Sequence, residues 1–248
     1  MSTYSSLGII TSQALELSDG LAFFAEMKKA LPALYPKKVG NYEPVRTLFD
    51  PRKKGELEQQ WRSPFIWKGA AVGSQGNVWF RQGLGKNSDI ICSAKTKDFD
   101  FERCQDFLGK TAKVMNAAFI YAHPFQSIEI ERARTNETLI TVVRGKSNYV
   151  SVSSIVLEKY IPDVYWYTIF GPPFVKHFGL KRLLATPANR VVQLGDHFVG
   201  IQLTGLSEIL DGAKMEEARS LVKSHLGQDA FFSLSRGASS KYRVCKLV

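Results

Sequence analysis

Few side chains in this sequence could carry out chemistry, and most of them are isolated. Asp196 and His197 are the only adjacent acid–imidazole pair, and Glu129 and Glu131 are the nearest approach to a pair of catalytic carboxylates. General acid–base catalysis needs such groups aimed at one point, but residues two apart on a helix do not share a face. With Glu43 as a further acid, these residues support only a small enzyme of unknown class, as an alternative interpretation.

Nucleophilic and metal chemistry are indicated even less. The sequence has no GxSxG elbow, and Cys104 falls at a core-facing helical position, where it is expected to act as a small hydrophobic residue. Cys92, Cys104 and Cys245 form no CxxC pair, and the histidines form no HxH or HxxxH pattern. We therefore expect no catalytic residue, no bound metal and no other cofactor.

The composition is that of an ordinary globular protein, with 44% hydrophobic and 23% charged residues among 248. No apolar run approaches the roughly 18–20 residues that a membrane-spanning helix needs, and the N-terminus lacks the pattern of a signal peptide. We expect a cytoplasmic protein with no membrane partner. The net charge of +10 is spread along the chain rather than gathered in an arm. A dispersed basic surface that binds nucleic acid therefore remains a second alternative.

The stretch 161–179 organises the rest of the chain, because it is dense in aromatic residues around two consecutive prolines. Proline fixes φ and removes a backbone donor, so the chain has to turn there. The pattern predicts a strand, a corner, and a short helix that ends at Gly179. Along an alternating strand, Trp166 would point inward, whereas Tyr165 and Tyr167 would face solvent or a partner. The expected structural corner consists of Trp166, Phe170, Gly171, Pro172, Pro173 and Gly179.

The elements around this stretch alternate between strands and amphipathic helices. Helical spacing of apolar residues predicts helices near 18–31, 98–116 and 214–225, the last with Met215, Ala218, Leu221 and Val222 on its apolar face. Short helices are expected near 126–134 and 152–160, and residues 50–56 look like a polar turn. Strands are predicted at 77–81, 89–94, 117–122 and 139–143, and a hairpin joins 190–194 to 198–204.

These elements predict one α+β domain over residues 1–248. We expect a mostly antiparallel sheet with two or three amphipathic helices packed on it, and residues 1–17 as a loosely attached segment. The loop 40–46 places Glu43 and Arg46 between aromatic residues and prolines. These two side chains could form a local ion pair, or they could contact a partner.

Several stretches resemble bacterial immunity proteins of polymorphic toxin and type VI secretion systems. They are residues 165–179, 183–188, 40–46, 225–232 and 242–244. The most similar families are the immunity protein 52 family and a related type VI immunity family. The resemblance implies a non-enzymatic inhibitor that binds a cognate toxin and occludes its active site, with Tyr165, Tyr167, Glu43 and Arg46 as candidate contacts. Because a chain of charge +10 would repel a basic toxin, we expect an acidic or neutral one.

Overall fold

The protein is built on one large antiparallel sheet, which confirms the expected α+β class. The computed structural model describes residues 4–81, 87–126, 129, 140–144, 147–233, 235–237 and 240–247. Ten strands follow the order β11-β12-β10-β7-β1-β6-β5-β4-β2-β3, and β8 and β9 form a separate hairpin. The strands are β1 (Tyr4–Thr11), β2 (Pro36–Gly40), β3 (Thr47–Leu48), β4 (Phe65–Gly69), β5 (Gln75–Arg81), β6 (Asn87–Lys95), β7 (Ala117–Phe125), β8 (Ile140–Arg144), β9 (Ser147–Ser151), β10 (Tyr167–Phe170), β11 (Arg190–Gln193) and β12 (Val199–Gln202).

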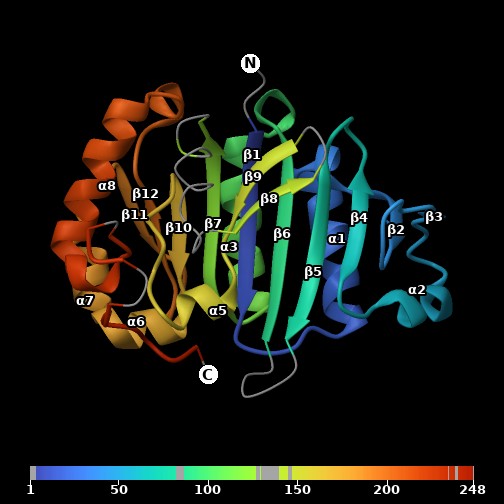
Figure 1. Cartoon of the computed structure of the whole chain (residues 1–248), viewed down its shortest axis with the longest axis horizontal. Coiled ribbons are helices and arrows are strands. Elements are labelled where there is room, and N and C mark those ends of the chain that lie inside the picture. Colours follow the sequence, from blue (N-terminus) through green and yellow to red (C-terminus); the bar gives the residue numbers. More distant parts are fainter. Residues whose placement is uncertain are drawn as a thin grey trace.

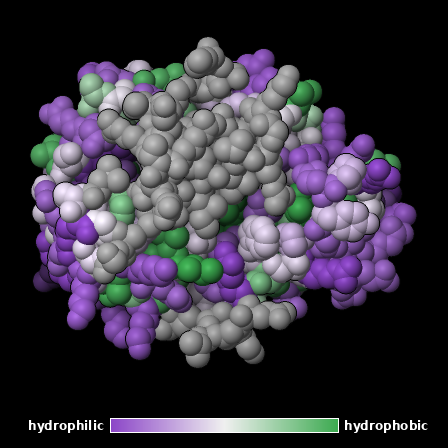
Figure 2. Space-filling view, in the orientation of Figure 1, coloured by the Kyte–Doolittle hydropathy of each residue, from purple (hydrophilic) through white to green (hydrophobic). Residues whose placement is uncertain are grey.

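Helices and the separate hairpin cover the two faces of the sheet. Figure 1 shows α1 and α3 behind the sheet, the β8–β9 hairpin in front of β1, and α6, α7 and α8 gathered at the β11–β12 end. On the face shown in Figure 2, hydrophilic residues dominate toward both ends, and apolar residues form only small groups. The helices are α1 (Leu17–Ala30), α2 (Lys54–Gln60), α3 (Phe101–Val114), α5 (Ser154–Leu157), α6 (Pro172–Phe178), α7 (Leu180–Leu184) and α8 (Gly212–Leu226).

The first strand is central to the sheet, so the expectation of a loosely attached N-terminal segment is wrong. β1 pairs antiparallel with β6 on one side and with β7 on the other, and all eight of its residues are buried. Its side chains alternate, with Leu7 and Ile9 on one face and Ser6 and Gly8 on the other. Gly8 is needed because a Cβ there would lie only 2.1 Å from the Tyr121 ring.

The three long helices lie where helical spacing predicts them, but two details differ. The stretch 50–56 is not simply a turn, because α2 begins at Lys54. On α8, Leu221 is half exposed, and Arg219 takes a buried place beside Met215 and Val222. The short helix expected at 126–134 falls almost entirely outside the described residues.

The aromatic corner forms as predicted. β10 ends at Phe170, and Pro172 begins α6, which ends at Gly179 with φ +87°. A Cβ on Gly171 would stand 1.9 Å from the carbonyl oxygen of Ala117, which lies on the neighbouring strand β7. The close approach of these two backbones therefore requires glycine at the corner.

Gly171→Ala should lower the free energy of unfolding by about 1–3 kcal/mol, because the added methyl group has to displace backbone. Gly205→Ala is the matched control, since its φ is −64° and a Cβ there would meet nothing closer than 3.9 Å. Urea unfolding measures both variants. Equal stability of the two variants would contradict this explanation of the corner.

Candidate functional site

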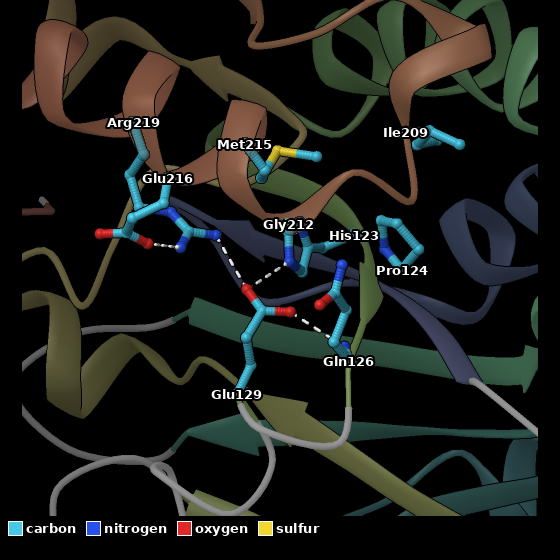
Figure 3. Close-up of a pocket in the computed structure, with 9 residues that line it drawn as sticks. All are labelled: His123, Pro124, Gln126, Glu129, Ile209, Gly212, Met215, Glu216 and Arg219. Carbon is cyan, nitrogen blue, oxygen red and sulfur yellow. Dashed lines mark hydrogen bonds and ion pairs between the residues drawn. The ribbon is translucent and has the colours of Figure 1, made fainter. Parts of the chain in front are cut away.

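One cavity of about 160 Å³ collects the polar side chains most suggestive of chemistry. It lies between the end of β7 and the first turns of α8, and Figure 3 shows Glu129 at its centre, directed toward Arg219, His123 and Gln126. It joins an imidazole to a carboxylate, the combination that would indicate an enzyme. Its lining residues are His123, Pro124, Gln126, Glu129, Ile209, Gly212, Met215, Glu216 and Arg219.

Helix α8 holds Arg219 in this cavity. Asp211 caps the helix by accepting hydrogen bonds from the backbone N–H groups of Ala213 and Lys214. Met215, Arg219 and Val222 are then spaced four and three residues apart, so they share the buried face. A lone arginine at this helical spacing is the sequence signal that could have located the cavity.

The guanidinium of Arg219 is almost fully buried, and its donors are divided among several partners. Nε donates to the backbone oxygen of Val164 at 3.0 Å and lies 3.3 Å from the Asp163 carboxylate. One terminal nitrogen donates to Glu216 at 2.7 Å, and the other donates to Glu129 at 3.0 Å. Arg219 therefore ties α8 to Glu129 and to the segment that enters β10.

Hydrogen bonding fixes the tautomer of His123. The backbone N–H of Trp166 donates to Nδ1 at 3.0 Å, so Nδ1 acts as an acceptor and carries no proton. Nε2 therefore holds the ring proton and donates it to Glu129 Oε1 at 2.9 Å. The second oxygen of Glu129 accepts from the backbone N–H of Gln126 at 2.9 Å. Both ring nitrogens of His123 are therefore engaged, and Glu129 accepts three hydrogen bonds from within the protein.

The charges in the cavity also compensate one another. Burial raises the pKa of the Glu129 carboxyl, but His123 and Arg219 outweigh this effect and hold the pKa well below its usual range. Burial lowers the pKa of Arg219, yet Asp163, Glu129 and Glu216 raise it above its ordinary value. Both groups therefore stay ionised at neutral pH, and the cluster is suited to fastening α8 to the sheet.

The other candidates for chemistry are not assembled into a site. Asp196 and His197 are exposed in the turn between β11 and β12, away from the cavity lining. Glu131 lies outside the described residues. Within the described part of the chain, no group of three or more acidic, histidine or cysteine side chains is arranged to hold a metal ion.

The tyrosines expected at the surface are buried, and the expectation that they face solvent is wrong. Tyr165 is 3% exposed and packs on Tyr121, with 4.7 Å between ring centroids. Tyr167 is 6% exposed and leans over Gly200. Trp166 is buried as predicted, and its indole N–H donates to the backbone oxygen of Thr204. β10 begins only at Tyr167, so Tyr165 and Trp166 precede the strand and its alternation does not decide which way they point.

The Glu43–Arg46 loop does reach the surface, beside the edge strand β3. Arg46 is exposed, and Glu43 forms a 2.7 Å ion pair with Lys68 on β4. Tyr42 and Leu48, which flank these residues, are 79% and 72% exposed. Buried Val45 anchors the loop from below.

Asn41 holds the start of this loop in place. Its side-chain amide nitrogen lies 2.8–3.1 Å from the carbonyl oxygens of Gln60, Arg62 and Pro64. The loop thus combines exposed apolar and charged side chains with a fixed backbone, and we name residues 41–48 the edge loop. Such a surface loses little conformational entropy when it binds a partner.

Comparison with known proteins gives a likeness of fold. No family model and no curated protein matches the sequence. Among solved structures, the chain is similar to "Pseudomonas aeruginosa T6SS protein PA0821", with a TM-score of 0.53 and 13% sequence identity. The likeness covers 89% of this chain and 73% of that one. Within the described residues, no helix combines the length and the apolar character that crossing a bilayer requires.

Arg219→Met should lower the free energy of unfolding by about 3–5 kcal/mol, because it removes the buried guanidinium that bonds Glu129, Glu216 and the Val164 carbonyl. Arg103→Met is the control. Arg103 forms an exposed ion pair with Asp100, and such pairs contribute about 0–1 kcal/mol. Chemical denaturation checks both variants. A loss below about 1 kcal/mol for Arg219→Met would show that α8 is held by other contacts.

Glu129→Gln should change how stability depends on pH. The pKa of Glu129 is lower in the folded state than its ordinary value of 4.5. Its stabilising contribution is therefore complete above that value and is lost as the pH falls below it. The variant should be less stable than wild type at pH 7, and the difference should shrink below about pH 4.5. Glu58→Gln, at an exposed position, is the control; a constant difference for Glu129→Gln across this range would contradict the assignment.

Proposed function

We propose that this protein is a non-enzymatic immunity protein of a type VI or polymorphic toxin system. It binds a cognate toxin in the cytoplasm in a one-to-one complex and occludes the toxin's active site. The observation that carries the proposal is the edge loop, a clamped surface segment that presents Tyr42, Glu43, Arg46 and Leu48. Aromatic and arginine side chains on a rigid frame are typical anchors of protein interfaces.

Three further observations support the proposal. The imidazole and carboxylate of the polar cavity are committed to each other and to Arg219, so they suit fastening better than catalysis. The fold is similar to that of a protein described as part of a type VI secretion system. The sequence motifs resemble immunity proteins of the same kind of system.

The charge of the chain sets an expectation for the toxin. At +10, the protein would be attracted to an acidic toxin and would repel a basic one at long range. An acidic or neutral toxin is therefore the partner we propose. Binding to nucleic acid is the competing outcome, and it predicts affinity that falls steeply with salt without any toxin.

Coexpression with the product of the adjacent gene should yield a one-to-one complex, and Tyr42→Ala should weaken it by about tenfold or more, as expected for an interface anchor. Leu221→Ala is the control, because Leu221 is half exposed on α8 at the other end of the sheet. Titration calorimetry on the purified proteins measures both affinities. No complex with the adjacent gene product, together with tight binding to duplex DNA, would overturn the proposal in favour of a nucleic-acid-binding protein.

A further inference from the structure

A second surface feature lies at the opposite edge of the sheet from the edge loop. A groove of about 570 Å³ runs between α3 and residues of the strands β10 and β11. We name it the α3–β11 groove. Residues that line it are Gln105, Asp106, Gly109, Lys110, Lys113 and Val114 from α3, and Tyr167, Arg190, Val192 and Leu194 from the sheet.

The groove exists because α3 stops short of the sheet edge. The helix packs on β7 and β10, and the groove opens where α3 faces Arg190 and Val192 of β11. The side chain of Leu194 lies beside Gly109 of α3, and a Cβ on that glycine would be in ordinary contact with it at 3.5 Å.

Charge and apolar surface are combined along the groove. Val192, Leu194 and the largely exposed Val114 supply apolar contacts. Lys110, Lys113 and Arg190 are exposed and basic, whereas the lining holds a single acidic residue. A ligand that fits this lining carries negative charge alternating with apolar groups.

The strand that borders the groove also has free backbone groups. Among the described strands, β11 is the last of the sheet and pairs only with β12. The Leu194 N–H donates across the hairpin to Phe198, so by alternation the backbone groups of Val192 and Arg190 also point toward β12. Those of Val191 and Gln193 point away from the sheet, and no described residue is recorded as their hydrogen-bond partner.

We propose that the α3–β11 groove binds an acidic, extended segment of a protein partner, which pairs with β11 as an added strand. Its backbone would bond to Val191 and Gln193, and alternate acidic side chains would meet Lys110, Lys113 and Arg190. Addition of a strand is a common mode of recognition at an exposed sheet edge. The identification of that partner as the toxin rests on the proposed function. The preference of the groove for an acidic strand does not depend on it.

Two other occupants fit less well. A second copy of the chain would bring Lys110, Lys113 and Arg190 of both copies together, and like charges oppose such an interface. A nucleic acid would satisfy the cations, but it has no backbone that can continue a β-ladder. An acidic strand alone uses both the charges and the free edge.

The test uses the full chain and a soluble peptide of about twelve residues that alternates glutamate with valine. Wild type should bind this peptide at low salt, and binding should weaken as salt rises. A lysine–valine peptide, the glutamate peptide with N-methylated amides, and a single-stranded oligonucleotide serve as comparison probes. Fluorescence anisotropy reports all four. Equal binding of the N-methylated peptide, or preference for the oligonucleotide, would overturn the proposal.

Two variants of the chain separate the charge from the strand edge. Val191→Pro removes an outward N–H and leaves the ladder to β12 intact, and Lys110→Glu with Lys113→Glu reverses the charge. Each should weaken binding of the glutamate peptide by at least about tenfold, whereas Lys54→Glu, at an exposed position on α2, should not. Thermal melts confirm that each variant is folded. Unchanged binding in both groove variants would overturn the proposal.

The same variants distinguish failure of this inference from failure of the proposed function. If the toxin complex forms and is insensitive to both groove variants, the groove is not part of the toxin interface and the immunity function stands. If the peptide binds and no toxin complex forms, the acidic-strand site stands and the immunity function fails.

Discussion

The buried charge of Arg219 is the constraint on which the arrangement of this fold depends. A guanidinium that loses its water needs acceptors in return, and Arg219 finds them in Glu129, Asp163, Glu216 and the Val164 carbonyl. Those groups belong to α8, to the end of β7 and to the segment entering β10. The arginine therefore fixes three separate parts of the chain relative to one another.

This arrangement also determines what the polar cavity can do. His123 and Glu129 have the identities of an acid–base pair, but the Trp166 N–H occupies one ring nitrogen and Glu129 takes the proton of the other. Catalytic groups need a lone pair or a proton available to a substrate. In this cavity both ring nitrogens of His123 and three acceptor sites of Glu129 are occupied by internal partners. The edge loop at β3 and the α3–β11 groove at the other end of the sheet are the surfaces on which we base the proposed binding.

The two edge strands of the sheet, β3 and β11, differ in what surrounds their exposed backbone. The edge strands of an open, uncovered sheet have backbone N–H and C=O groups that pair with no neighbouring strand. At β3, the edge is short and the adjoining loop is held by the Asn41 amide. At β11, basic side chains flank the free edge, so an uncharged or basic strand gains less there than an acidic one does.

Much of this fold follows from local pattern, and the candidate site does not. The helical spacing of apolar residues predicts α1, α3 and most of α8. Pro172, Pro173 and Gly179 predict the position of the corner. The central place of β1 depends on pairing with β6 and β7, which are distant in sequence, so nothing local marks it. The prediction fails for Tyr165 because it lies before β10 and packs on Tyr121 of β7, and for Tyr167 because it lies over Gly200 of β12; both contacts are tertiary. Arg219 and Glu129 meet across 90 residues, a separation that spacing rules cannot bridge.

A titration of toxin activity is the most direct test of whether this protein acts by binding its partner rather than by catalysing a reaction on it. The product of the adjacent gene, which we propose to be the toxin, would be assayed at fixed concentration against increasing amounts of the purified chain. Inhibition that rises linearly and becomes complete at one equivalent is the result the account predicts. Complete inactivation by a small fraction of an equivalent would reveal turnover, and that result would contradict it.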